Sequence, residues 1–116
     1  MTELLSPMSM AKSFFVKSGH MLHRVNFIEI RWIHSDGNYC TIHTKEKKYA
    51  VKISLTKLKQ RLPMSHFSQI HRSYIVQTDL ITNIDLTSLE VYLDDLALPF
   101  GRTYKEALIQ QLNLLQ

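Results

Sequence analysis

Residues 67–76 read Phe67-Ser68-Gln69-Ile70-His71-Arg72-Ser73-Tyr74-Ile75-Val76. The two flanks of this stretch, 67–70 and 74–76, are rich in β-branched and aromatic residues, which favour strands. The polar trio His71-Arg72-Ser73 separates the flanks. The stretch therefore predicts two short strands joined by a polar loop that carries an arginine.

More short strands are predicted on the N-terminal side. In the segment 28–33, apolar residues at 28, 30 and 32 alternate with charged residues at 29 and 31, as in a half-buried strand, and Trp32 is expected to anchor the core. The turn Asp36-Gly37-Asn38 separates this strand from the next one. The other strands expected in this half are 14–17, 21–25, 39–44 and 48–53.

Two helices and three further strands complete the prediction. Ser54 is expected to cap a short helix with Leu55, Leu58 and Leu62 on one face, which Pro63 ends. Strands are expected at 80–81, 89–93 and 96–98. The last helix should open on a capping box, Thr103 with Glu106, and carry an apolar stripe of Leu108, Ile109, Leu112 and Leu115.

Length and composition indicate one globular domain. The chain has 116 residues, 45% of them hydrophobic, which leaves no room for a multidomain enzyme. Its single cysteine excludes a disulfide framework and a tetrathiolate zinc site. No apolar run reaches the roughly 18 residues of a membrane-spanning helix. We expect a soluble, cytoplasmic protein with a tail or linker remnant at 1–13 and one domain at 14–116.

Charge is distributed unevenly along the chain. Residues 1–61 hold 11 Lys and Arg against 4 Asp and Glu, whereas residues 62–116 hold 3 against 6, which together give the net charge of +4. The basic half suits a polyanionic partner, although lysines spread over a strand and a helix are also typical of an ordinary solvated face.

The residues offer little for catalysis or metal binding. Cys40 and His43 differ by an odd number within one predicted strand, so their side chains should point to opposite faces. Asp94-Asp95 is typical of a turn, and the six histidines have no zinc-ligand spacing. The three glycines form no phosphate-binding loop. We therefore expect no enzyme activity, no metal and no cofactor.

Three polar loop residues have side chains suited to DNA base edges: Asn38, Arg72 and Arg102. Arginine pairs with guanine and asparagine with adenine through two hydrogen bonds each. Structural roles are the alternatives. Asn38 could take the left-handed position of its turn, and the arginines could form salt bridges at the edge of the core.

Several motifs, taken together and in their order along the chain, resemble the LytTR-type DNA-binding domain of bacterial response regulators. They are Ile30-Arg31-Trp32-Ile33, Gly37-Asn38-Tyr39, Tyr49-Ala50-Val51-Lys52, Leu55 to Leu58, the stretch 67–76, Leu98-Pro99-Phe100-Gly101-Arg102 and Tyr104-Lys105. The resemblance runs from about Phe15 to Leu115. The sequence departs from the family pattern at Val76-Gln77, where the family has Val-Asn, and at Phe100-Gly101, where it has valine and serine.

The resemblance implies a mainly β fold, an elongated arrangement of several short antiparallel sheets with a short mid-chain helix and a C-terminal helix. It also implies that loops contact the DNA bases, at positions that match Asn38, Arg72 and Arg102. The first and third would enter successive major grooves, and Arg72 would cross the minor groove between them. For phosphate contacts we expect Lys48, Lys52 and Lys105.

The function expected from this resemblance is sequence-specific double-stranded DNA binding in a transcription regulator of the two-component, phosphorelay type. Two copies should bind paired repeats as a dimer. The chain would be either an output domain excised from behind a receiver domain served by a histidine kinase, or a stand-alone regulator under the control of a partner. The alternative is a protein or single-strand nucleic-acid interaction module, with Tyr39, Tyr49 and Tyr74 as an aromatic platform.

Overall fold

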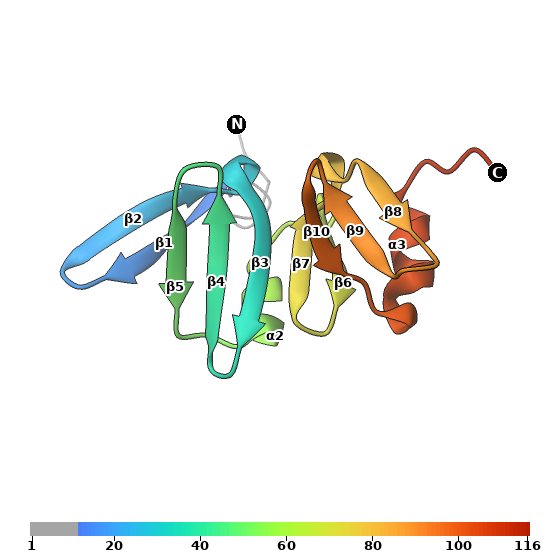
Figure 1. Cartoon of the computed structure of the whole chain (residues 1–116). Helices are drawn as coiled ribbons and strands as arrows, with labels where there is room; N and C mark the ends of the chain where they lie inside the picture. Colours follow the sequence, from blue (N-terminus) through green and yellow to red (C-terminus); the bar gives the residue numbers. More distant parts are fainter. Residues whose placement is uncertain (1–11) are drawn as a thin grey trace, which may run out of the picture.

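The computed structural model describes residues 12–116, which form three antiparallel sheets and two α-helices (Figure 1). The first sheet pairs β1 (Ser13–Ser18) with β2 (Met21–Asn26). The central sheet has the order β5-β4-β3-β7-β6, and the third has the order β10-β9-β8. The central strands are β3 (Ile30–Asp36), β4 (Tyr39–Thr44), β5 (Lys48–Val51), β6 (Phe67–His71) and β7 (Tyr74–Gln77). The third sheet consists of β8 (Asn83–Asp85), β9 (Glu90–Leu93) and β10 (Leu96–Pro99).

This arrangement confirms the mainly β, multi-sheet fold expected from the sequence. The helices are α2 (Leu55–Lys59) and α3 (Lys105–Gln111), with short 3-10 helices at Phe27–Glu29, Thr78–Leu80 and Arg102–Tyr104. Of the predicted tail, residues 1–11 lie outside the described part, and β1 begins at Ser13. No helix in residues 12–116 is long and apolar enough to cross a membrane.

Two hydrophobic clusters hold the described part of the chain together, and the β6–β7 hairpin contributes to both. Phe67 and Ile75 belong to the first cluster, with β1 to β5 and α2, whereas Ile70 and Val76 belong to the second, with β8 to β10 and α3. Successive side chains of a strand point to opposite faces, so one hairpin can pack on both sides. The stretch 67–76 therefore joins the two halves of the molecule.

The short helix α2 confirms the predicted cap and start, but it ends at Lys59, so Leu62 lies beyond the helix and Pro63 does not end it. The Ser54 hydroxyl accepts a hydrogen bond from the Lys57 amide at 3.2 Å, which caps the helix. Leu55, Leu58 and Leu62 are all buried in the first cluster. Here the signals are local, because a cap and an apolar spacing of three to four residues depend only on neighbours in sequence.

The strand predicted at 28–33 is confirmed only in part, because β3 begins at Ile30 and runs to Asp36. Ile28 lies in a 3-10 helix and is 82% exposed. A register irregularity between Ile30 and Trp32 then shifts the alternation, so that Ile30 and Ile33 are fully buried while Trp32 is half-buried beside the second cluster. A β-bulge adds one residue to a strand and thereby changes the face to which later side chains point. Trp32 is thus not the centre of the core.

Two C-terminal predictions also need correction. Residues 80–81 form no strand; a 3-10 helix ends at Leu80, and β8 follows at Asn83. Thr103 lies inside the 3-10 helix that precedes α3 and caps nothing, since α3 starts at Lys105. The predicted stripe holds at Leu108, which is buried, but Leu115 lies beyond the helix and is 92% exposed.

Candidate nucleic-acid interface

The turn between β3 and β4 presents Asn38 to solvent. Asp36 pairs with Tyr39, which leaves Gly37 and Asn38 as a two-residue hairpin loop. The positive φ of 62° falls on Gly37, and Leu89 and Asp94 are the non-glycine residues with positive φ among those described. A glycine at the first loop position is what a type II′ hairpin requires. Asn38 therefore does not serve the left-handed position, and its exposed amide is available to a partner.

The turn between β6 and β7 presents Arg72. His71 pairs with Tyr74 across it, and the Ser73 amide donates to Nδ1 of His71 at 3.1 Å. The Ser35 amide of β3 donates to the Ser73 carbonyl at 2.9 Å, which fastens this turn beside the β3–β4 turn. The Arg72 side chain is exposed at the tip.

Arg102 comes from the segment between β10 and α3, which is held against β6. The Gly101 amide donates to the Ile70 carbonyl at 2.8 Å. A Cβ on Gly101 would lie 3.2 Å from the Tyr104 ring and 3.8 Å from Cα of His71. A serine here, as in the family pattern, would crowd the Tyr104 ring, so Gly101 permits a close approach to the β6–β7 turn. Arg102 itself is exposed.

The structure therefore brings the three predicted base-contact residues to one edge of the molecule. The β3–β4 turn, the β6–β7 turn and the start of the Arg102–Tyr104 helix follow one another along the lower edge in Figure 1. We call this row of three loops the loop edge.

The three predicted phosphate-contact lysines are all exposed but do not share one place. Lys52 directly follows Val51, which pairs with Cys40, so it lies beside the β3–β4 turn. Lys105 opens α3, three residues after Arg102. Lys48 pairs with His43, five residues along β4 from Asn38 and hence about 17 Å away at the usual rise of a strand. Lys48 is thus at the opposite end of the sheet from the loop edge.

An aromatic stack that the sequence analysis missed covers part of the central sheet. Trp32 stacks on His43 with ring centroids 3.6 Å apart and an interplanar angle of 7°. His34 stacks on Tyr74 at 4.5 Å. Burial lowers the pKa of His43, and the nearby Lys48 and His34 lower it further. Only the strand register could reveal this stack, because its members come from β3, β4 and β7.

The proposed tyrosine platform does not assemble. Tyr49 pairs with the buried Ile42 and lies 5.9 Å from the His23 ring, whereas Tyr74 pairs with His34 on the other face of the sheet. Two strands, β3 and β4, separate β5 from β7. Tyr39 is half-exposed beside the β3–β4 turn.

The thiol of Cys40 lies in the hydrophobic core. Its side chain is fully buried, and Sγ donates to the Ile53 carbonyl at 3.2 Å. Burial raises the pKa of this thiol, which keeps it protonated. Cys40 packs in the first cluster while His43 stacks on Trp32 across the sheet, so the two do not form a dyad. Among residues 12–116, no group of three or more His, Cys, Asp or Glu could hold a metal ion.

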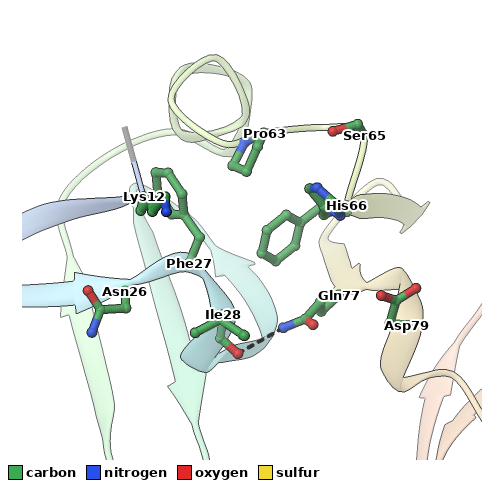
Figure 2. A pocket seen from close by; sticks show the side chains of 10 residues that line it. Lys12, Asn26, Phe27, Ile28, Pro63, Ser65, His66, Gln77 and Asp79 are labelled. Atoms are coloured by element: carbon green, nitrogen blue, oxygen red, sulfur yellow. Dashed lines mark hydrogen bonds between the residues drawn. The ribbon is translucent and has the colours of Figure 1, made fainter. Parts of the chain in front are cut away.

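A hollow of about 650 Å³ lies away from the loop edge, between the segment 26–28, the segment 63–67 and β7 (Figure 2). Phe27, Ile28, Pro63 and Phe67 supply much of its lining. The Gln77 amide crosses it and donates to the Ile28 and Ile30 carbonyls at 3.1 and 2.8 Å. Gln77, a departure from the family pattern, thus ties β7 to the start of β3.

The fold and its loop edge define a small β domain that presents polar and basic loop residues on one side. The model of the LytTr DNA-binding domain family matches residues 20–113, and the chain belongs to this family. The family is one of DNA-binding domains and is not an enzyme family.

Similar proteins agree with this assignment. The chain is 29% identical over 100 residues to the transcriptional regulatory protein LytR of Staphylococcus aureus, a match that covers 83% of this chain and 39% of the relative. It is 26% identical over 100 residues to the sensory transduction protein LytT of Bacillus subtilis, covering 83% and 42%. The chain thus spans about two fifths of the length of these relatives.

A solved LytTr DNA-binding domain from Bacillus cereus has the same fold. It superimposes with a TM-score of 0.76 over 90% of this chain and 99% of the other, at 21% sequence identity. At this identity the likeness concerns the fold alone.

Proposed function

We propose that this domain binds double-stranded DNA sequence-specifically, as the output module of a cytoplasmic bacterial transcription regulator of the response-regulator type. Asn38 and Arg102 read base edges in successive major grooves, and Arg72 enters the minor groove between them. Two copies occupy paired repeats, and a receiver domain or a kinase-linked partner controls them.

One observation carries this proposal: three exposed side chains with base-pairing chemistry lie on three hydrogen-bonded loops along one edge. Each loop is fixed to the sheet by a backbone contact, so the side chains start from defined positions. Fixed loops reduce the entropy lost on binding. The row of loops runs along the domain, as contact with successive grooves of one duplex requires (Figure 1).

Two lysines flank this edge in the proposal. Lys52 lies beside the Asn38 turn and Lys105 beside Arg102, where they can neutralise backbone phosphates. Lys48 is left out of the contact set, because its position at the far end of β5 puts it about 17 Å from the Asn38 turn.

A binding selection from random duplex DNA, performed at two salt concentrations, tests the proposal. We expect the wild-type domain to enrich a paired motif. Arg102→Ala should lose discrimination at one position in each repeat, at a cost of about 1–3 kcal/mol. Lys52→Ala should weaken all sequences alike and reduce the salt slope by about one unit. Lys48→Ala, at the other end of β5, is the matched control and should change the slope less than Lys52→Ala.

Two outcomes would contradict the proposal. If no motif is enriched and binding only falls with rising salt, the domain does not read sequence. If Arg102→Ala and Lys52→Ala behave alike, the division into base and phosphate contacts is wrong.

A further inference from the structure

The β6–β7 turn is tight and lacks the backbone conformation that tight hairpin turns favour. His71 pairs with Tyr74, so Arg72 and Ser73 are the two loop residues. Two-residue hairpin loops favour turn types in which one or both loop residues have a positive φ. Gly37 supplies this φ in the β3–β4 turn, whereas neither Arg72 nor Ser73 has a positive φ. The β6–β7 turn therefore depends on contacts with side chains and neighbouring strands.

The His71 side chain supplies one of these contacts. Its Nδ1 accepts a hydrogen bond from the Ser73 amide at 3.1 Å, two residues further along the chain. Asn and Asp side chains accept from the same amide in an Asx turn, so the imidazole nitrogen here takes the place of a side-chain oxygen. On the other side, the Ser73 carbonyl accepts from the Ser35 amide of β3 at 2.9 Å. His71 thus closes the turn that carries Arg72 at its tip.

The backbone of His71 is itself held by neighbouring elements. Its carbonyl accepts from Nε2 of Gln69 at 3.1 Å, and Oε1 of Gln69 accepts from Nζ of Lys59 on α2 at 2.9 Å. The register of β6 is irregular between Gln69 and His71, and there the Ile70 carbonyl accepts from the Gly101 amide at 2.8 Å. The imidazole therefore meets the Ser73 amide from a defined position.

Only a neutral imidazole can accept this hydrogen bond. Nδ1 is an acceptor while the ring proton is on Nε2, but the charged imidazolium donates from both nitrogens. Burial lowers the pKa of His71, and the charges of Arg72 and His34 lower it further, so the ring is neutral at neutral pH. The titratable and charged side chains on the elements around His71 are Arg72 on the turn, His34 and Asp36 on β3, Lys59 on α2, Tyr74 on β7, and Arg102 and Tyr104 on the 3-10 helix after β10. Protonation of His71 in acid breaks its bond to the Ser73 amide.

We propose that His71 is a positioning residue for base recognition, whose neutral ring holds the β6–β7 turn so that Arg72 enters the minor groove in one orientation. When Nδ1 takes up a proton, the Ser73 amide is released and Arg72 lies on a loosened turn. Discrimination between A·T and G·C pairs in that groove then falls. This inference rests on the proposed function, because the placement of Arg72 matters only if Arg72 reads the DNA.

The test measures a central discrimination ratio, the ratio of the Kd values for two duplexes. One duplex carries the enriched site, and in the other the base pairs between the two major-groove contacts are changed from A·T to G·C or the reverse. A ratio is used because charged histidines also attract DNA phosphates regardless of sequence. Arg72→Ala should abolish the ratio. In the wild type, measured from about pH 7.5 to about pH 5 while circular dichroism shows the domain folded, the ratio should fall about fivefold below pH 6.5.

Three variants isolate the hydrogen bond. His71→Asn keeps an acceptor for the Ser73 amide but does not titrate, so the ratio should stay at its neutral value in acid. His71→Leu removes the acceptor, so the ratio should be about fivefold lower even at neutral pH. His66→Asn, the same change on the exposed histidine directly before β6, is the control and should follow the wild-type profile. His34 and His43 remain in all of these variants, so their titration cannot make His71→Asn differ from the wild type.

Solution NMR tests the turn without DNA. The Ser73 amide resonance should shift as His71 titrates in the wild type and in His66→Asn, because the amide loses its acceptor. In His71→Asn the same resonance should stay in place over that pH range. This measurement also decides the matter if His71→Leu does not fold.

Failure of this inference is distinguishable from failure of the proposed function. A wild-type ratio that does not change as His71 titrates, or a ratio that responds to acid equally in the wild type and in His71→Asn, overturns the positioning role. Absence of an enriched motif, or a ratio that Arg72→Ala leaves unchanged, overturns the proposed function instead. In that event the Ser73 resonance decides: a shift that follows His71 supports the closed turn, and a resonance that ignores the titration overturns it.

Discussion

The Gln111 side chain at the end of α3 should contribute substantially to stability, which we predict from its hydrogen bonds. Its Oε1 accepts from the fully buried Ser68 hydroxyl at 2.8 Å, and its Nε2 donates to the carbonyls of Met64 and Phe67 at 3.1 and 2.9 Å. These bonds join α3, which follows the Arg102 segment, to β6 and the segment before it. Gln111 is thus the polar link between α3 and the β6–β7 hairpin.

The expected cost of Gln111→Ala is about 2 kcal/mol. Each hydrogen bond contributes roughly 0.5–1.5 kcal/mol net, so three give about 1.5–4.5 kcal/mol. The low half of that range applies, because the Gln111 side chain is exposed enough for water to replace part of the loss and Ser68 keeps its 2.6 Å contact with Thr78. For a domain of this size, the melting temperature should fall by about 8 °C.

Urea unfolding followed by circular dichroism measures this cost, with Gln110→Ala as the matched control. Gln110 is the neighbouring glutamine on the same helix and is exposed, so its replacement should change the free energy of unfolding by less than about 0.5 kcal/mol. Equal effects of the two variants would refute the reasoning that the Gln111 bonds fasten α3 to β6.

Three further predictions concern the histidines, the thiol and the aromatic stack. Burial lowers the pKa of His43 and of His71 below 6.5, so the unfolded chain binds more protons than the folded one in acid. The free energy of unfolding should therefore be level above pH 6.5 and fall as the pH drops from 6.5 to the folded pKa values. Urea midpoints measured across that range would show this fall. Cys40 should react with a thiol reagent only as fast as the domain opens, so rapid labelling of the native protein would contradict its burial. Trp32→Ala should remove the stack on His43 and raise the His43 pKa, which histidine proton NMR would detect; an unchanged value would mean that the indole does not bury the ring.

Local sequence patterns were enough to predict the local elements and the residue types of the interface. The cap at Ser54, the leucine spacing of α2 and the Gly37-Asn38 turn depend on neighbours in the chain, and each was predictable. The stretch 67–76 indicated a hairpin, and its alternation explains why it packs on both sides. The chemistry of Asn38, Arg72 and Arg102 was also evident before their positions were known.

Which of these residues share a surface depends instead on contacts between distant parts of the chain. The bulge after Ile30 and the 3-10 helix before it expose Ile28, a change of register that depends on pairing with β4 and not on the residues of the segment. Strand pairing likewise put Lys52, which directly follows β5, beside the loop edge, and Lys48, the first residue of β5, at the far end. The edge itself exists because Ser35 bonds to Ser73 and Gly101 to Ile70, contacts between residues roughly 30 to 40 positions apart that no local pattern encodes.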